Sequence, residues 1–422
     1  MKFIADFHLH SAYSRATSKE MHLPIMARWA KLKGLSLLGT GDFTHPAYFE
    51  EITNELEETG LGLLVLKGEA NPACRFILTA ETSHIYTQGG RGRRVHMMIF
   101  APDIRTVRKI NAHLGRIGNV TSDGRPIFGF SAKDLVKLVL DIEPGCLLVP
   151  AHAWTPWFSV FGSHSGFNSL EECFEEETPH IFAIETGLSS DPAMNWRWSA
   201  LDRLSLISNS DAHSPAKIGR EANVFDCELS YSAVIRAIKD KDPQRFLSTL
   251  EFFPEEGKYH YDGHRACGIC YAPGQTKEKN YLCPVCGKPL VVGVMHRVEE
   301  LADRPQGFVP PKTIPAVHLV PLEEILAEVF ETGIQSKRIR KEYLRLIEKG
   351  GSEFLILMDL SEEELRAFME DRLVEGIMRV RKGLIKARPG YDGVYGKISI
   401  FSEENAQQPL NSSKESTQLS LF

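Results

Sequence analysis

The sequence lacks any long apolar run. No stretch reaches the roughly 18 consecutive apolar residues of a membrane-spanning helix. Its first ten residues, MKFIADFHLH, also lack the charged, apolar and small-residue order of a signal peptide. These absences favour a cytoplasmic protein with no membrane partner. The 422 residues, 43% of them hydrophobic, suffice for two or three globular domains.

An excess of positive charge is also missing. The formal net charge is −6, which excludes a uniformly basic nucleic-acid coat but allows a local basic groove on an acidic body. Basic residues cluster in three places, which predicts local phosphate-binding patches, although such runs are also typical of solvated helix faces. The clusters are Arg91, Arg93 and Arg94; Lys337, Arg338, Arg340 and Lys341; and Arg379, Arg381, Lys382, Lys386 and Arg388.

Cysteines are few, and half of the eight are scattered. The other four follow the spacing C-x2-C-x12-C-x2-C. In a reducing compartment this spacing favours zinc over disulfides, and it predicts one closed, structural zinc site rather than redox-active pairs. The predicted thiolate ligands are Cys267, Cys270, Cys283 and Cys286.

The chain divides into four segments by pattern. From residue 1 to about 250, short apolar runs alternate with helix-like segments, as in a β/α fold. Residues 251–315 form the predicted zinc module, and residues 316–400 show the apolar spacing of three and four that is typical of helices. Residues 401–422 are polar and predict a disordered tail.

The stretch DFHLH places Asp6, His8 and His10 at alternate positions, so in an extended strand the three side chains share one face. Asp211 and His213 repeat the same spacing in NSDAH. A single histidine is more often a surface or core residue than a ligand, but this repetition is difficult to produce by packing alone. The pattern therefore indicates a metal site.

Further ligand-type residues follow other apolar runs, namely Glu81, His96 and His152. We expect them at strand ends, because a parallel β/α barrel gathers the carboxyl ends of its strands at one mouth. Mixed imidazole and carboxylate ligands suit zinc, manganese or iron, and two or three such ions are the usual apparatus for phosphoester hydrolysis.

Across about residues 1 to 250, these motifs resemble the signatures of the polymerase and histidinol phosphatase (PHP) family, metal-dependent phosphoesterases on a distorted seven-stranded β/α barrel. The resemblance implies a first metal on His8, His10, Glu81 and Asp211, and a second on Glu81, His96 and His152, with Glu81 as a bridge. It implies a third on Asp42 and His213, where GTGDFTH leaves open whether Asp42 or His45 is the ligand. The implied catalytic residues are Asp211, His213 and Glu81.

Most of the chain is similar to the endonuclease Q family. The features that resemble the family are SRATS after DFHLH, the aromatic loop AHAWTPWFSVFGSHSGFNS, the four-cysteine module and the helical C-terminal region. The resemblance implies a DNA repair endonuclease that cuts on the 5′ side of uracil, hypoxanthine, xanthine and abasic sites. We expect 3′-hydroxyl and 5′-phosphate ends from two or three divalent ions, which could be Zn, Mn, Mg or Fe.

The aromatic loop follows the predicted ligand His152. Its flat rings could stack on an extruded base, whereas a hydrophobic lid or core loop is the alternative interpretation. Phe161 belongs to the same loop. The candidate DNA or lesion contacts of the chain are Trp154, Trp157, Phe158, Arg91, Arg93, Lys337, Arg338 and Arg340.

The last five residues, QLSLF, resemble the pentapeptide by which bacterial proteins bind the replication sliding clamp. Leu419, Leu421 and Phe422 would fill an apolar pocket, and Gln418 would make polar contacts. The resemblance implies a bacterial protein that acts at the nucleoid with the clamp as partner.

Two alternatives compete with the endonuclease. A small-molecule phosphatase of the histidinol-phosphate type would share the barrel, but it needs no zinc module, basic helices or clamp peptide. A non-catalytic, clamp-associated DNA-binding protein would not need to retain the full set of ligand residues.

Overall fold

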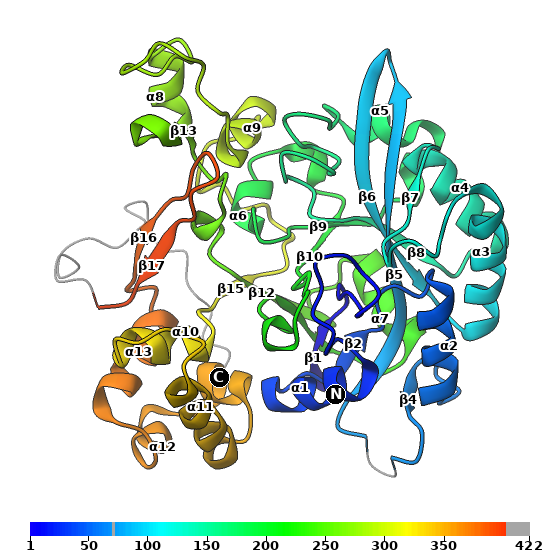
Figure 1. Cartoon of the computed structure of the whole chain (residues 1–422), viewed down its shortest axis with the longest axis horizontal. Coiled ribbons are helices and arrows are strands. Elements are labelled where there is room, and N and C mark those ends of the chain that lie inside the picture. The colour runs from blue at the N-terminus through cyan, green and yellow to red at the C-terminus, as the bar shows by residue number, and fades with distance from the viewer. Residues whose placement is uncertain (70–71, 402–422) are drawn as a thin grey trace.

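A computed structural model describes residues 1–69 and 72–401, and it shows a mixed α/β protein with one large sheet (Figure 1). The main path of the sheet runs β15-β12-β11-β1-β2-β5-β4-β3, and β6, β7 and β8 extend it beyond β5. Its strands are β1 (Lys2–Asp6), β2 (Leu37–Gly39), β3 (Leu56–Glu58), β4 (Leu64–Leu66), β5 (Arg75–Gln88), β6 (Arg91–Ala101), β7 (Ile127–Phe128), β8 (Leu147–Pro150), β11 (Ala222–Asp226), β12 (Phe246–Glu251) and β15 (Ala316–His318).

Strand directions are mixed. β1, β2 and β5 pair in parallel, whereas β6 runs antiparallel to both β5 and β8. Glu81 and His96 were predicted at strand ends, and that prediction is wrong: Glu81 lies within β5 and His96 within β6. The reason is that β5 and β6 form one long hairpin, which continues well past the point where the other strands stop.

A separate parallel pair, β9 (Ala183–Glu185) and β10 (Ser205–Ile207), lies beside this sheet. Backbone hydrogen bonds join the pair to the sheet on both sides: Ala153 donates to Glu185 O at 2.9 Å, and His10 donates to Ala212 O at 3.0 Å. The carboxyl ends of β1, β8, β9 and β10 therefore meet. The seven-stranded count of the predicted barrel stays a prediction.

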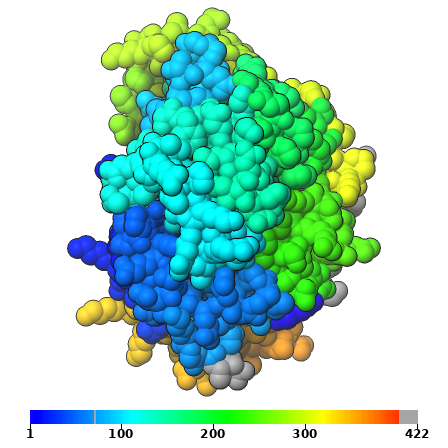
Figure 2. All heavy atoms as spheres, turned by 90° about the vertical axis from the view of Figure 1, so that its right-hand side faces the viewer, coloured from blue at the N-terminus to red at the C-terminus, as the bar shows by residue number. Residues whose placement is uncertain are grey.

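Helices cover the sheet on the side of α2, α3 and α4 (Figure 1), and Figure 2 shows this face, with the far end of the β5–β6 hairpin rising at its top. Apolar residues fill two clusters, in which Phe3, Ala5 and Phe7 belong to one and Ile4 to the other. The helices of this part are α1 (Leu23–Lys33), α2 (Pro46–Glu55), α3 (Ile104–Ile117), α4 (Ala132–Ile142), α5 (Leu170–Phe174), α6 (Pro192–Asn195) and α7 (Tyr231–Asp240).

The cysteine-rich unit follows β12. It contains the antiparallel pair β13 (Asp262–His264) and β14 (Ile269–Tyr271), then α8 (Pro273–Glu278) and α9 (Val294–Leu301). The chain then returns to the sheet, where β15 pairs with β12.

The C-terminal region, predicted to be helical, contains α10 (Leu322–Val329), α11 (Lys337–Gly350), α12 (Glu362–Arg366) and α13 (Asp371–Arg381). Its last part is instead a hairpin of β16 (Lys386–Arg388) and β17 (Lys397–Ser399), which reaches back to the cysteine-rich unit (Figure 1). The Pro389-Gly390 pair and Gly393, whose φ is +82°, favour a turn over a helix there.

The C-terminal helices have their own apolar core and dock on α1 through a buried ion pair. Lys33 Nζ lies 2.6 Å from Glu353 Oε2, and Tyr343 donates to the same oxygen at 2.7 Å. None of the helices in residues 1–69 and 72–401 has both the length and the apolar character that crossing a bilayer requires. The predicted tail, apart from Phe401, lies outside the described residues, and so does the QLSLF peptide.

Candidate active site

Two histidines and an aspartate form a first group where β1 and β10 end. His10 Nε2 lies 3.1 Å from Asp211 Oδ1, and His8 Nε2 lies 3.6 Å from the same oxygen. Their candidate ligand atoms all lie within 4.8 Å of one another. Both imidazoles are buried, while Asp211 is 28% exposed, so one metal ion could bind here with access from outside.

Glu81 lies between this group and a second one. Its Oε2 is 3.5 Å from His8 Nε2 and 3.3 Å from His10 Nε2. Its Oε1 is 2.7 Å from His96 Nδ1 and 3.1 Å from His152 Nε2. The two oxygens of one buried carboxylate thus face two separate sets of imidazoles.

The residues present fit divalent cations. Within the described part of the chain, the buried His8 Nε2 has no hydrogen-bond partner. Burial alone would lower the pKa of His8, but the carboxylates of Glu185, Glu81 and Asp211 raise it well above the ordinary value, so the site favours positive charge. Imidazole and carboxylate donors of this kind suit zinc, manganese or iron.

Glu185 supports both groups from behind. Its carboxylate lies 3.0 Å from His8 Nδ1, accepts from the backbone N of His152 at 2.8 Å, and accepts from Asn209 at 2.9 Å. Sequence reasoning missed it as a site residue, although AIETG shows the same polar end to an apolar run as the other ligand segments. Arg125 was missed too: its Nη1 lies 2.9 Å from Glu81 Oε2, and the sequence carries no signal for it.

Asp6, the first residue of DFHLH, does not converge with the two histidines. Its carboxylate accepts from the backbone N of Ser210 at 3.1 Å and of Gly219 at 2.9 Å. Burial raises the pKa of Asp6 to about 6, although these hydrogen bonds lower it. Asp6 therefore braces the segment that carries Asp211.

Among the described residues, Asp42, His45 and His213 form no third group of ligands. Asp42 Oδ1 lies 3.1 Å from His10 Nδ1, and its other oxygen accepts from Ser11 N and Oγ at 2.6 Å. His45 lies elsewhere, with Nε2 3.1 Å from Thr121 O. The His213 ring packs on His10 at 4.4 Å. Asp42 thus supports His10 as Glu185 supports His8.

Known proteins resemble the chain over nearly its whole length. The family described as the MJ0043 C-terminal domain matches residues 321–384. The uncharacterized protein YqxK of Bacillus subtilis is 29% identical over 411 residues, which cover 94% of this chain and 99% of YqxK. The crystal structure of the lesion-specific endonuclease PfuEndoQ from Pyrococcus furiosus superposes with a TM-score of 0.85 at 31% identity, covering 97% of this chain and 98% of that one.

The chain belongs to the endonuclease Q family. A second endonuclease Q structure, in complex with a 27-mer duplex that has an abasic lesion at the active site, matches with a TM-score of 0.83 and 31% identity, covering 98% of this chain and all of that one. The family assigned from the sequence and the nuclease class are thereby confirmed.

In this chain, a member of the endonuclease Q family, one part of the aromatic loop lies in the core and another part lies at the surface. Trp154 is buried, donates to Asn195 Oδ1 at 2.7 Å and packs on Phe161, so its prediction as a DNA contact is wrong. Trp157 is 38% exposed, and Phe158 packs on the ring of His96 at 4.8 Å. The loop thus places one exposed ring and one half-buried ring beside the second ligand group.

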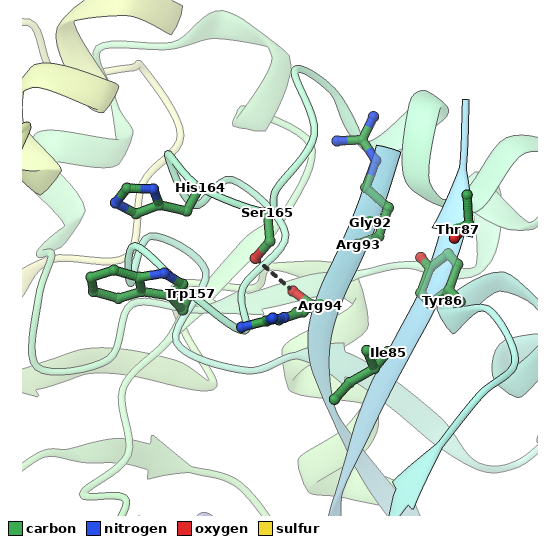
Figure 3. A pocket seen from close by; sticks show the side chains of 9 residues that line it. All are labelled: Ile85, Tyr86, Thr87, Gly92, Arg93, Arg94, Trp157, His164 and Ser165. Carbon is green, nitrogen blue, oxygen red and sulfur yellow. Dashed lines mark hydrogen bonds between the residues drawn. The ribbon is translucent and has the colours of Figure 1, made fainter. Parts of the chain in front are cut away.

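A cavity of about 390 Å³ lies between this loop and the β5–β6 hairpin (Figure 3). Trp157 and His164 stack at 4.5 Å on the loop side, and Arg94 lies over the Phe158 ring at 5.5 Å. A neighbouring cleft of about 310 Å³ is lined by Arg91, Arg93 and Arg297, among others. The first basic cluster of the sequence therefore lines both hollows.

The other two basic clusters lie on the C-terminal region. Lys337, Arg338 and Arg340 are exposed at the start of α11, and Arg338 lies over the ring of Phe330 at 4.2 Å. In the third cluster, Arg381 donates to the carbonyls of Leu357, Leu360 and Ile356, and Arg379 to that of Ile400. These two arginines hold the helical unit together.

The structure brings Cys267, Cys283 and Cys286 together with His264, and places Cys270 outside this group. His264 Nδ1 lies 3.4 Å from Cys286 Sγ, whereas Cys270 Sγ lies 4.0 Å from Pro389 O. The sequence offers both possibilities, because H-x-x-C-G at 264–268 repeats the spacing of C-x-x-C-G at 283–287. Each ends in a glycine with positive φ, +66° at 268 and +70° at 287, which a tight turn requires.

Proposed function

We propose that this chain is a metal-dependent DNA repair endonuclease that cuts the phosphodiester on the 5′ side of a damaged nucleotide. The observation that carries the proposal is the position of Glu81, whose two oxygens face two sets of ligand residues beside a cationic, aromatic-lined cavity. Its substrates are deaminated bases (uracil, hypoxanthine and xanthine) and abasic sites. Support comes from the relative whose structure holds a duplex with an abasic lesion.

We assign the first metal to His8, His10, Glu81 and Asp211, and the second to Glu81, His96 and His152. When bound, such ions polarise a phosphoryl oxygen and promote the ionisation of water, which suits an in-line displacement that leaves 3′-hydroxyl and 5′-phosphate ends. Arg125 adds a positive charge beside Glu81. His213, 32% exposed with Nδ1 3.1 Å from Asp211 O, is placed to move a proton through its other ring nitrogen.

In this proposal, the cavity and the basic clusters bind the DNA. Trp157 and Phe158 offer ring faces on which an extruded or neighbouring base can stack. Arg91 and Arg93 lie along the adjacent cleft, where backbone phosphates are the fitting ligand. Lys337, Arg338 and Arg340 form a second, separate phosphate-binding patch.

Cleavage of defined duplexes tests this function. The purified protein is incubated with Mg²⁺ or Mn²⁺ and oligonucleotides that carry uracil, hypoxanthine, xanthine, an abasic site or no lesion. We expect a single cut 5′ of the lesion and none in the undamaged duplex. Release of phosphate from histidinol phosphate without any cutting of DNA would instead show a small-molecule phosphatase, and binding without cutting a non-catalytic DNA-binding protein.

The cysteine-rich unit holds a structural zinc ion in this proposal. Its ligands are Cys267, Cys283, Cys286 and His264, with His264 in place of Cys270. Four protein ligands close a tetrahedral site, so this ion takes no part in the chemistry. The unit spans 251–315, between the catalytic barrel (1–250) and the C-terminal DNA-binding region (316–400).

The clamp peptide Gln418–Phe422 lies outside the described residues, and its role rests on the sequence alone. We propose that it binds the bacterial sliding clamp and brings the enzyme to the nucleoid. A short apolar peptide gives affinity on the order of micromolar, which tethering to a clamp on DNA converts into a high local enzyme concentration. Deleting residues 418–422 should abolish clamp binding and leave cleavage of short oligonucleotides unchanged.

A further inference from the structure

One side chain of the cysteine-rich unit grips the aromatic loop beside the metal ligands. Arg297, on α9, donates through Nε to Phe161 O at 3.0 Å, and through Nη2 to Phe167 O at 3.0 Å and Asn168 Oδ1 at 2.8 Å. Its side chain is only 12% exposed. The guanidinium thus links two points of the loop, Phe161 and the Phe167–Asn168 pair.

The position of α9 is itself fixed by the strand that leads to the cysteine cluster. His296, next to Arg297, lies with Nδ1 2.6 Å from Asp262 Oδ2, and both side chains are fully buried. The other oxygen of Asp262 accepts from Gly293 N at 2.7 Å, just before α9 begins. Asp262 starts β13, and β13 ends at His264, one of the four clustered ligand residues.

On its other side, the loop reaches the cavity and the second ligand group. Trp157 stacks on His164 with the two rings 8° from parallel, and both line the cavity (Figure 3). The Trp157 ring also meets Tyr259 of the cysteine-rich unit edge to face at 5.5 Å. Phe158 O accepts from the backbone N of His96 at 3.1 Å. Movement of the loop would therefore move the Trp157 ring.

We propose that Arg297 is a positioning residue through which the cysteine-rich unit holds the Trp157 wall of the cavity in the conformation that receives damaged DNA. This inference rests on the proposed function. Arg297 acts through the loop and not on the reacting phosphate. Its loss should weaken substrate binding while the chemical step continues.

Steady-state kinetics on an abasic duplex tests the proposal in full-length protein. Arg297→Ala should raise KM about tenfold and change kcat less than about threefold, which is the pattern expected for lost binding. Arg297→Lys should match Arg297→Ala, because an ammonium group keeps the charge but cannot reproduce a planar fork to three acceptors. Trp157→Ala should raise KM similarly, and the double variant should raise it no further.

Two further variants complete the design. Arg304→Ala is the matched control. Arg304 also anchors this part of the chain, through Asp202 at 2.5 Å and 2.7 Å, but within the described residues its side chain bonds Asp202 and Trp196 O rather than the loop. The KM of this variant should equal that of the wild type. Asn168→Ala removes one acceptor from the loop side and should raise KM by a smaller factor, which keeps the test open if Arg297→Ala fails to fold.

The outcomes separate the alternatives. If Arg297→Lys retains the wild-type KM while Arg297→Ala does not, Arg297 binds DNA through its charge, and the positioning role is wrong. Multiplying effects of Arg297→Ala and Trp157→Ala on KM would likewise overturn it, since they would show independent action. A wild-type enzyme that cuts abasic DNA, with Arg297→Ala indistinguishable from it, refutes this inference alone; a wild type that cuts no damaged DNA refutes the proposed function as well.

Discussion

His8 Nδ1 lies 3.0 Å from each carboxylate oxygen of Glu185, and the opposite ring nitrogen points at Glu81 and Asp211. A carboxylate behind a ligating histidine fixes its tautomer and ring orientation and strengthens the ligand, and its loss commonly costs about 10- to 100-fold in activity or metal affinity.

Glu185→Gln should therefore lower cleavage of an abasic duplex by about 10- to 100-fold, with a corresponding loss of catalytic metal. The amide keeps the size of the side chain, so the melting temperature should change little. Metal titration of cleavage measures the effect, and the exposed Glu176→Gln is the control. Wild-type activity at limiting metal would show that Glu185 is only a core residue.

Asp211→Asn should reduce cleavage by more than about a hundredfold and leave DNA binding intact, because the amide is a poorer metal ligand while the barrel is unchanged. Gel shift and cleavage assays on the same abasic duplex separate the two effects. Cutting at the wild-type rate would exclude Asp211 from the metal site.

Asp42→Ala should lose more activity than His45→Ala. Asp42 contacts the Nδ1 of His10 and three donors from Ser11 and Ser14, whereas His45 bonds the carbonyl of Thr121 away from the ligand groups. We expect a loss of about tenfold or more for Asp42→Ala and about twofold for His45→Ala. Equal or reversed losses, measured on the abasic duplex, would restore His45 as the ligand.

His264→Ala should lose the tightly bound zinc ion, and Cys270→Ser should keep it. Zinc needs all four ligands of a closed tetrahedral site, and Cys270 lies outside the cluster. Elemental analysis after dialysis against a mild chelator counts the ion per chain. Zinc lost from Cys270→Ser but kept by His264→Ala would return the site to four thiolates.

Glu256→Gln should make stability less sensitive to pH. Burial, with repulsion from Glu324 and Glu255, raises the pKa of Glu256 to about 8 in spite of Lys217. Between about pH 5 and 8 the folded protein keeps this proton while the unfolded chain releases it, so stability falls as pH rises through that window and levels off above it. The variant should lack this part of the fall.

Thermal unfolding at several pH values across that window measures the difference, with the exposed Glu348→Gln as the control. Parallel curves for wild type and Glu256→Gln would show that the carboxyl titrates normally.

The local pattern was sufficient for the first-group ligands. The spacing of DFHLH and NSDAH predicted a metal site, and the structure brings His8, His10 and Asp211 within reach of one ion. Glu81, His96 and His152 also come together, but for a different reason than expected, since two of them sit inside a long hairpin rather than at strand ends. The sequence pattern predicted which residue types are the ligands, whereas the pairing of the strands determined where they lie.

Cysteine spacing predicted a zinc site on four thiolates, whereas the structure groups His264, and not Cys270, with the other three cysteines. C-x-x-C at 267 and 270 and H-x-x-C at 264 and 267 have equal spacing, so the sequence does not decide between them. The pairing of β13 with β14 decides it, because Cys270 lies opposite Gly263 on the second strand, beyond the turn that His264 and Cys267 enclose.

By itself the sequence determined the β/α character of the first 250 residues and the types of side chain in the two predicted metal sites, because periodicity and short spacings are local properties of the chain. The family was indicated by the resemblance of its motifs to those of endonuclease Q. Only the tertiary structure decided that Glu185 supports His8 from 177 residues away, that Asp42 supports His10, that Trp154 enters the core while Trp157 faces the cavity, and that Arg297 reaches the aromatic loop. These contacts depend on which strands and loops become neighbours in space, and no local spacing encodes that choice.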